Sequence, residues 1–112
     1  MSSVAPSESE TLTVELAGEL TIRSITELRE RLLEALRTGR AVVARIADDA
    51  ATDLTFVQLI EATRRSAQAA GQAFALAGPA TGPLLETLRR AGMLSAAAPA
   101  QTEFWLTPTG EQ

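Results

Sequence analysis

The chain has 112 residues, of which 46% are hydrophobic and 21% charged, so it is long enough for one compact core and too short for two ordinary domains. Ten basic against fourteen acidic residues give a formal charge of -4, and no basic, aromatic-spaced stripe is present, which argues against a nucleic-acid partner. Cys and His are absent, and with them the thiolate nucleophile, the commonest general base and the commonest zinc ligand; most familiar hydrolase chemistries are thereby excluded.

The N-terminal residues 1–10 are rich in Ser, Pro and Glu, which is typical of a flexible leader. They lack the basic and apolar parts of a secretion signal, and no apolar run in the chain approaches the roughly 20 residues that span a bilayer. We therefore expect a cytoplasmic protein with no membrane insertion.

The first strand and helix follow this leader. Residues 11–17 alternate apolar and polar side chains, which predicts a half-buried strand closed by Gly18. The sequence Ser24-Ile25-Thr26-Glu27 reads as a capping box, and apolar residues then recur at helical spacing until Gly39. These patterns predict a strand followed by a helix with one buried face.

A second strand and a second helix come next. The run 41–47 shows no alternation before Arg45, as expected of a short strand buried on both faces. A polar loop follows, and Thr52 or Asp53 is suited to cap a helix that begins around Leu54. In the first turn of that helix, the hydroxyl of Thr55 meets free backbone N–H groups and the positive dipole end, which favour an oxyanion. Thr55 is therefore a candidate switch residue.

The second helix is predicted to end at Gly71, with Glu61, Arg64 and Arg65 on its solvated side. A third short strand over 73–77 and a last helix from 81 to 92 follow. Residues 95–100 read as a linker inside a C-terminal tail, 95–112. Within that tail, Phe104-Trp105-Leu106 is apolar enough to dock on the domain or on a partner.

Strands and helices thus alternate along residues 11–94. This order predicts an α/β fold: a small mixed β-sheet of about four strands, packed with three to five helices and with parallel neighbours joined through helical crossovers.

Residues 12–94 resemble STAS domains, the fold of bacterial anti-sigma-factor antagonists. The resemblance is carried by the order of elements and by three local matches: Gly18-Glu19-Leu20 after the first strand, Val42-Val43 followed by Asp53-Leu54-Thr55, and the return strand from Gly71 to Leu76. The sequences around Glu19 and Asp53 look most like those of small stand-alone STAS proteins of chemotaxis-type signalling clusters.

The resemblance implies a regulatory hydroxyl at the third position of an Asp-Ser-Ser-Gly-like motif, which is Thr55 here. The leading acid is kept as Asp53, whereas Leu54 and Phe56 replace small residues, and Phe56 is expected to crowd an approaching kinase. Two acidic positions of the family are also changed, to Thr21 and to Arg45, and Arg45 is expected within reach of a phosphate on Thr55.

We expect the loop and the first helical turn around Thr55 to form a partner-binding surface. Its residues are Asp48, Asp49, Thr52, Asp53, Leu54, Thr55 and Phe56. The plainer interpretations are that Thr55 belongs only to the cap or first turn, that Asp48 and Asp49 form a solvated turn rather than a metal site, and that Phe56 is core rather than a docking knob.

Two functional hypotheses stay open. In the first, the chain is a non-catalytic bacterial signalling module, like an anti-sigma-factor antagonist or a chemotaxis-type protein, which binds a protein partner and is switched at Thr55. In the second, it is a structural or regulatory STAS subunit of a transporter complex, with a permanent interface and no phospho-switch. An enzyme is disfavoured because no nucleophile is paired with a base at recognisable spacing, and we expect no metal and no cofactor.

Overall fold

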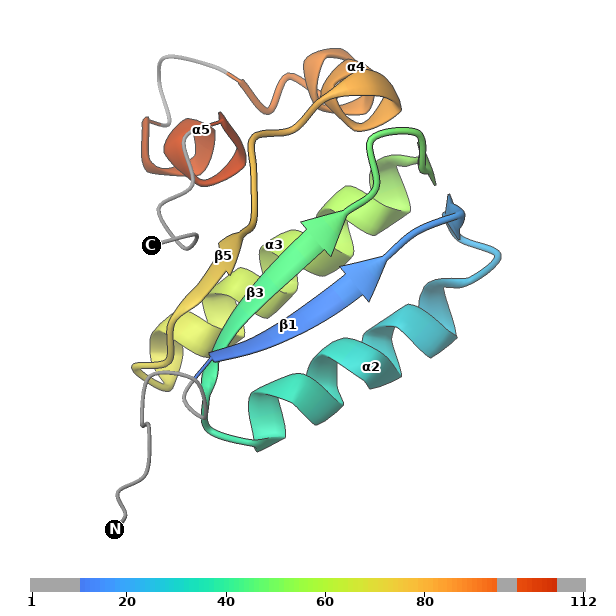
Figure 1. Ribbon diagram of the computed structural model, residues 1–112. Coiled ribbons are helices and arrows are strands. Elements are labelled where there is room, and N and C mark those ends of the chain that lie inside the picture. Colours follow the sequence, from blue (N-terminus) through green and yellow to red (C-terminus); the bar gives the residue numbers. More distant parts are fainter. Residues whose placement is uncertain (1–10, 95–98, 107–112) are drawn as a thin grey trace, which may run out of the picture.

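The computed structural model describes residues 11–94 and 99–106 (Figure 1). Its described part is α/β, as predicted, with strands and helices alternating through most of the chain. The strands are β1 (Thr11–Leu16), β2 (Glu19–Leu20), β3 (Ala41–Ile46), β4 (Ala51–Thr52) and β5 (Phe74–Leu76), and the helices are α2 (Ile25–Arg37), α3 (Leu54–Ala69), α4 (Gly82–Arg90) and α5 (Pro99–Leu106). The predicted leader 1–10, the linker positions 95–98 and the end of the tail, 107–112, lie outside the described residues.

The main sheet has the order β1-β3-β5, and both of its strand pairs are parallel. Central β3 pairs on both sides, with Val42 opposite Leu12 and Phe74. Val42 and Ala44 are buried because they face the helices that cover this sheet. Parallel strands need crossover connections, which α2 and α3 supply, so the predicted crossovers are confirmed.

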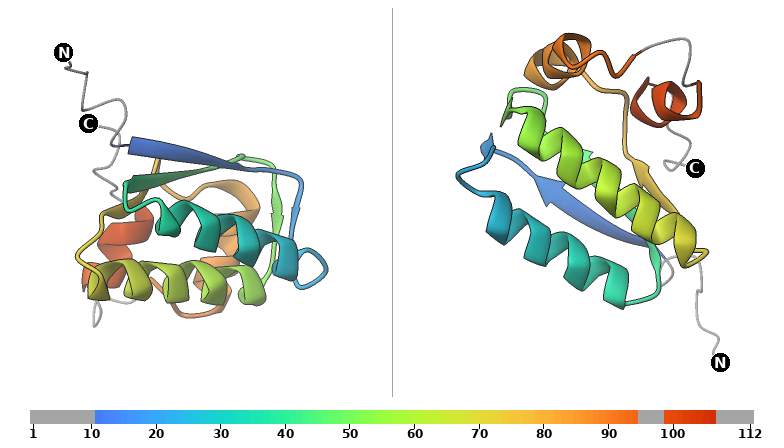
Figure 2. Two further views of the ribbon diagram at one scale, coloured as in Figure 1. Left: turned by 90° about the horizontal axis from the view of Figure 1, so that it is seen from below. Right: turned by 180° about the vertical axis from the view of Figure 1, so that it is seen from behind.

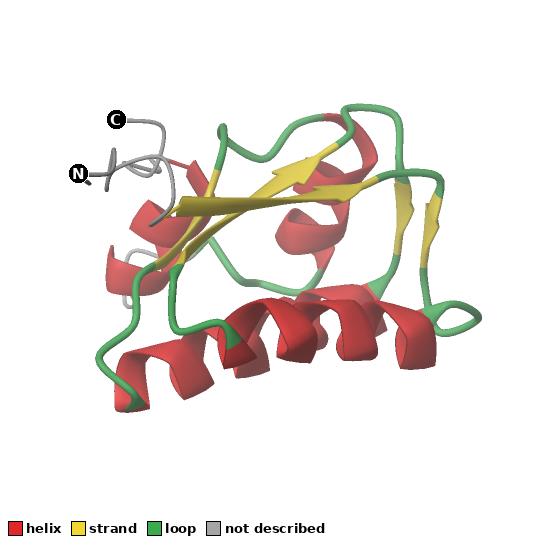
Figure 3. Ribbon diagram, turned by 60° about the horizontal axis from the view of Figure 1, so that its bottom comes forward, coloured by secondary structure: helices red, strands yellow, loops and turns green. Residues whose placement is uncertain are grey.

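Helices α2 and α3 lie side by side beneath one face of the main sheet (Figures 2 and 3). Their apolar stripes meet the inward side chains of β1 and β3, with Leu32 from α2 and Ile60 from α3 almost fully buried in the shared core. Burying side chains of this size contributes about 1.5–3 kcal/mol each relative to exposure. The amphipathic patterns therefore orient both helices, and with them the ends that carry the candidate site.

A second sheet of two parallel strands, β2 and β4, stands beyond the main sheet (Figure 3). Glu19 pairs with Ala51 and Leu20 with Thr52. These strands fall where the sequence indicated a turn and a polar loop. Two-residue strands have no periodicity of their own, so only their pairing across the chain creates them.

The capping box predicted at the start of α2 is wrong. Ser24 occupies the N-cap position but makes no capping hydrogen bond with its side chain. Its hydroxyl instead donates to the carbonyl oxygen of Glu19 at 2.6 Å and accepts from the backbone N–H of Thr21. The serine therefore ties α2 back to β2 and shapes the turn between them.

Helix α5 begins at Pro99, within the stretch that the sequence indicated as a linker. It lies beside β5 (Figure 1), and its Trp105 is fully buried in the core of the domain. The carbonyl oxygen of Trp105 accepts a hydrogen bond from the backbone N–H of Ala80 at 2.8 Å. Phe104 stacks on Phe74 of β5, with ring centroids 5.8 Å apart.

Candidate functional site

Asp53 holds together two segments that are 31 residues apart in the sequence. It is the N-cap of α3, in extended backbone conformation, and its Oδ1 accepts from the backbone N–H of Phe56 at 3.1 Å. Its Oδ2 accepts from the backbone N–H of Ile22 at 3.0 Å. Of the two predicted caps, Asp53 is therefore the one used, and it also binds the β2–α2 turn to the start of α3.

The three residues after Asp53 point into different environments. Leu54 is 49% exposed, Thr55 is half-buried and Phe56 is completely buried in the core. Within the described part of the chain, the Thr55 hydroxyl makes no hydrogen bond, so it takes no part in the cap. The crowding expected from Phe56 does not arise, since its ring packs inward.

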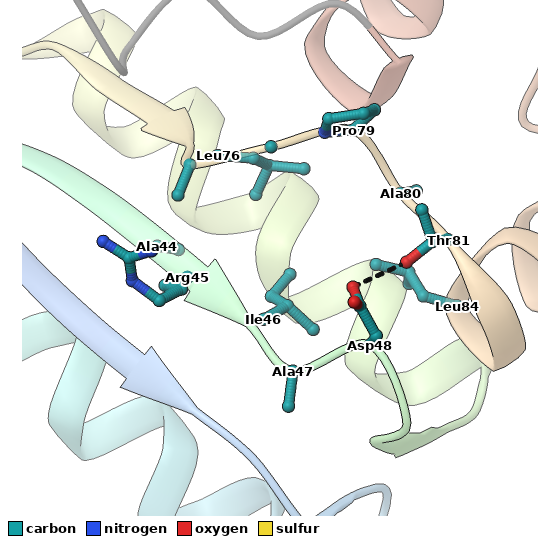
Figure 4. Close-up of a pocket in the computed structure, with 12 residues that line it drawn as sticks. Ala44, Arg45, Ile46, Ala47, Asp48, Leu76, Pro79, Ala80, Thr81 and Leu84 are labelled. Carbon is teal, nitrogen blue, oxygen red and sulfur yellow. Dashed lines mark hydrogen bonds between the residues drawn. The ribbon is translucent and has the colours of Figure 1, made fainter.

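Thr52 and Asp48 are tied to α4. The hydroxyls of Thr52 and Thr87 lie 3.0 Å apart and share a hydrogen bond, and Thr81 Oγ1 donates to Asp48 Oδ1 at 2.9 Å (Figure 4). Helix α4 also passes so close to this loop that a Cβ on Gly82 would stand 2.5 Å from the carbonyl oxygen of Asp48. The loop between β3 and β4 is therefore fixed from one side by α4, while Asp49 remains exposed.

A cavity of about 390 Å³ lies beside this loop, where β3 and β5 end (Figure 4). It is lined mainly by small and apolar residues, together with Arg45, Asp48 and Thr81. Ligands of parallel α/β sheets bind at the carboxyl ends of the strands, but the lining here offers no convergent set of polar groups. We therefore do not place the functional site in this cavity.

Arg45 does not approach Thr55. Its Nε lies 3.2 Å from Glu15 Oε2 on the exposed face of the main sheet, whereas its neighbour Ala44 points into the core toward α3. Successive side chains of a strand point to opposite faces, so Arg45 and the helix that carries Thr55 lie on opposite sides of the sheet. The expectation that Arg45 meets a phosphate on Thr55 is wrong.

Glu61 was placed on the solvated side of α3 by its helical position, and the structure corrects this. It is only 4% exposed. Its Oε2 accepts from Trp105 Nε1 at 2.8 Å, and its Oε1 accepts from Arg64 at 2.8 Å. The docked α5 covers this side of α3, which a pattern within α3 alone cannot indicate.

Ile22 is the surface residue that the sequence reasoning missed. It is 62% exposed and lies next to the candidate site through its bond to Asp53. The available signal was an apolar residue in a polar turn, Thr21-Ile22-Arg23-Ser24. The contact with Asp53 itself depends on the fold.

Residues 11–94 and 99–106 contain no group of three or more acidic, His or Cys side chains arranged to hold a metal ion. None of the helices in these residues is both long and apolar enough to cross a membrane.

The comparisons with known proteins give one match. A family model described as "Mlab, STAS domain" matches residues 4–95, which span α2, α3, α4 and all five strands. Searches among curated proteins and among solved structures give no match.

Proposed function

The chain belongs to the STAS domain family, and we propose that it is a non-catalytic regulatory module that binds a partner protein through the start of α3. STAS domains are generally non-catalytic, and they commonly mediate protein–protein interactions. The proposed surface consists of the β3–β4 loop and the first turn of α3, with Asp48, Asp49, Thr52, Asp53, Leu54 and Thr55 as its residues. Phe56 supports it from within the core.

The observation that carries this proposal is the contrast between Asp53 and Thr55. Asp53 is engaged by both carboxylate oxygens, so the start of α3 is joined to the β2–α2 turn. Among residues 11–94 and 99–106, nothing hydrogen-bonds to the hydroxyl of Thr55, two residues later and next to the exposed Leu54. Such a hydroxyl beside a hydrogen-bonded backbone suits both contact with a partner and modification.

Phosphorylation of Thr55 would act through charge. A phosphate adds close to two negative charges and three strong acceptors. The free N–H groups and dipole of α3 favour it by about 0.3–1 kcal/mol, so the helix itself tolerates the group. Thr55 directly follows the exposed Leu54, so a partner docked over Leu54 would bury the phosphate within the apolar contact and remove its water, which is costly. The phosphorylated form is therefore the non-binding form.

A second candidate is a permanent subunit of a larger complex, with Thr55 never modified. The exposed side chains of Leu54 and Ile22 favour it, because permanent interfaces are more apolar than transient ones. Replacement of the family's small residue by Leu54 points the same way. Both candidate functions use the same partner-binding surface, and they differ in whether phosphorylation of Thr55 controls the binding.

The test uses the full chain as bait in its own cells. Proteins that co-purify with the wild type are compared with those that co-purify with Thr55→Glu and with Thr55→Val, which removes the hydroxyl without adding charge. Phosphopeptide mass spectrometry of the purified wild type is done in parallel. The switch requires phosphate on Thr55 and loss of the partner from Thr55→Glu alone. A partner retained by all three chains, with no phosphate found, rejects the switch and favours the permanent subunit.

A further inference from the structure

The described part of this protein buries its large apolar side chains wholly or in part, except for two that are exposed. Within residues 11–94 and 99–106, Ile22 and Leu54 are the large hydrophobic residues that are exposed, at 62% and 49%. They come from different elements, the β2–α2 turn and the first position of α3. Both flank Asp53, whose carboxylate accepts from Ile22 N–H and whose own chain continues into Leu54. We call them the apolar pair.

Several hydrogen bonds hold the backbone that carries the apolar pair. Strands β2 and β4 pair just before its two members, and Ser24 fastens the turn that carries Ile22 through bonds to Glu19 and Thr21. The carboxylate of Asp53 joins the two segments. Contacts that are ordered before binding lose little conformational freedom when a partner arrives. These bonds therefore present the two side chains ready for contact.

The formal negative charge of the chain falls in the two sequence segments that carry the apolar pair. The two segments that carry it, 17–27 and 47–56, contain five acidic residues, Glu19, Glu27, Asp48, Asp49 and Asp53, and one basic residue, Arg23. The rest of the chain has nine acidic and nine basic residues, so the whole formal charge of -4 belongs to these segments. Of the five acidic residues in these segments, Glu19 lies three residues before Ile22 and Asp49 five residues before Leu54, and both are exposed; we call these two carboxylates the acidic rim of the apolar pair.

We propose that the apolar pair and its acidic rim dock into an apolar groove of a partner protein that is bordered by Arg or Lys. This inference rests on the proposed function and names the chemistry of the partner. Opposite charges around an apolar centre guide the encounter and reject wrong partners. A second copy of this chain fits poorly, because a two-fold contact would bring the two acidic rims together. An anionic membrane surface is repelled in the same way.

The test places a photo-activated cross-linking amino acid at position 22 of the full chain in its own cells. A matched control carries it at Gln68, an exposed position on the far part of α3. Mass spectrometry identifies the peptide joined to position 22. The proposal expects a peptide of another protein that has apolar residues flanked by Arg or Lys, and no such product from position 68. A cross-link to this chain itself, to an acidic peptide or to nothing overturns it.

The protein identified in this way is then purified and titrated with four chains: wild type, Ile22→Ser, a double variant Glu19→Gln with Asp49→Asn, and a control double variant Glu30→Gln with Glu34→Gln on the exposed side of α2. We expect Ile22→Ser to weaken binding about tenfold or more. The rim variant should weaken binding at about 50 mM salt and lose most of its salt dependence, because the two rim charges that salt would otherwise screen have been removed. The control should match the wild type.

The outcomes separate this inference from the proposed function. If Leu54→Ser weakens binding while Ile22→Ser and the rim variant do not, the partner uses the start of α3 without the apolar pair or the rim, and only this inference fails. If none of the three changes binding, the proposed function fails with it. Circular dichroism of each variant confirms that the chain is folded, since the substituted side chains are exposed.

Discussion

Trp105 Nε1 donates a hydrogen bond to Glu61 Oε2 at 2.8 Å, and this buried contact joins residues 44 positions apart. The remaining charge of Glu61 is met by Arg64, whose guanidinium also lies over the ring of Phe104, 5.3 Å from its centroid. A buried carboxylate is tolerated only when it is paired and hydrogen-bonded. The pair therefore fastens α5 to α3 and makes α5 part of the domain.

Replacing Trp105 should lower the stability of the whole domain. Trp105→Ala removes a fully buried side chain, and we expect a loss of about 3–5 kcal/mol in the free energy of unfolding. Trp105→Phe keeps much of the packing but leaves one Glu61 oxygen without its donor, which costs about 1–3 kcal/mol. Urea denaturation measures both values. As a control, Glu86→Gln breaks an exposed ion pair with Arg90 and should change stability by less than about 1 kcal/mol. Equal stability of the wild type and Trp105→Ala would show that α5 is not held in this way.

Asp53→Ala should destabilise both the start of α3 and the β2–α2 turn, because it removes a hydrogen bond from each. The start of α3 loses its cap, which is worth about 0.5–2 kcal/mol, and Ile22 loses the acceptor for its backbone N–H. Asp53→Asn keeps one oxygen and should lie between Asp53→Ala and the wild type. Amide hydrogen exchange followed by NMR reads both sites directly. Faster exchange at Phe56 alone, with Ile22 unchanged, would contradict the link between the turn and the helix.

Gly82→Ala tests the close approach of α4 to the β3–β4 loop. Gly82 has a φ of 56°, a left-handed conformation, and its added Cβ would meet the carbonyl oxygen of Asp48 at 2.5 Å. Gly71→Ala is the matched control, because its φ is 68° and its Cβ would meet nothing within 4 Å. Both variants carry the left-handed penalty of about 1–2 kcal/mol, and only Gly82→Ala adds the clash. Thermal unfolding should therefore rank Gly82→Ala clearly below Gly71→Ala. The same melting temperature for both would mean that the loop moves away freely.

Local patterns in the sequence predicted the parts of this fold that depend on neighbouring residues. The start of α3 at Leu54 and the buried strand with Val42 and Ala44 follow from a cap and an apolar run. Strands β2 and β4 could not be predicted, because each has two residues and exists only through its partner. The same reason explains Ser24, whose hydroxyl was assigned to its own helix but bonds to Glu19.

The candidate site likewise has a part that local sequence predicted and a part that depends on the fold. Its position at the start of α3 follows from Asp53 and the helix it caps, both local signals. The neighbours that shape it come from elsewhere in the chain: Ile22 through Asp53, and the threonines of α4 through Thr52 and Asp48. Arg45 was misplaced because strand alternation sets its face, and the sequence alone did not show which face α3 covers.

The central claim is that a partner protein binds over the first turn of α3, and the most direct measurement is isothermal titration of the purified partner with Leu54→Asp. Leu54 is exposed and Asp is well suited to the first helical turn, so the variant should fold normally. The claim predicts that binding weakens at least about tenfold, because a charge replaces an apolar contact at the interface. Binding of Leu54→Asp with the same affinity as the wild type would contradict it.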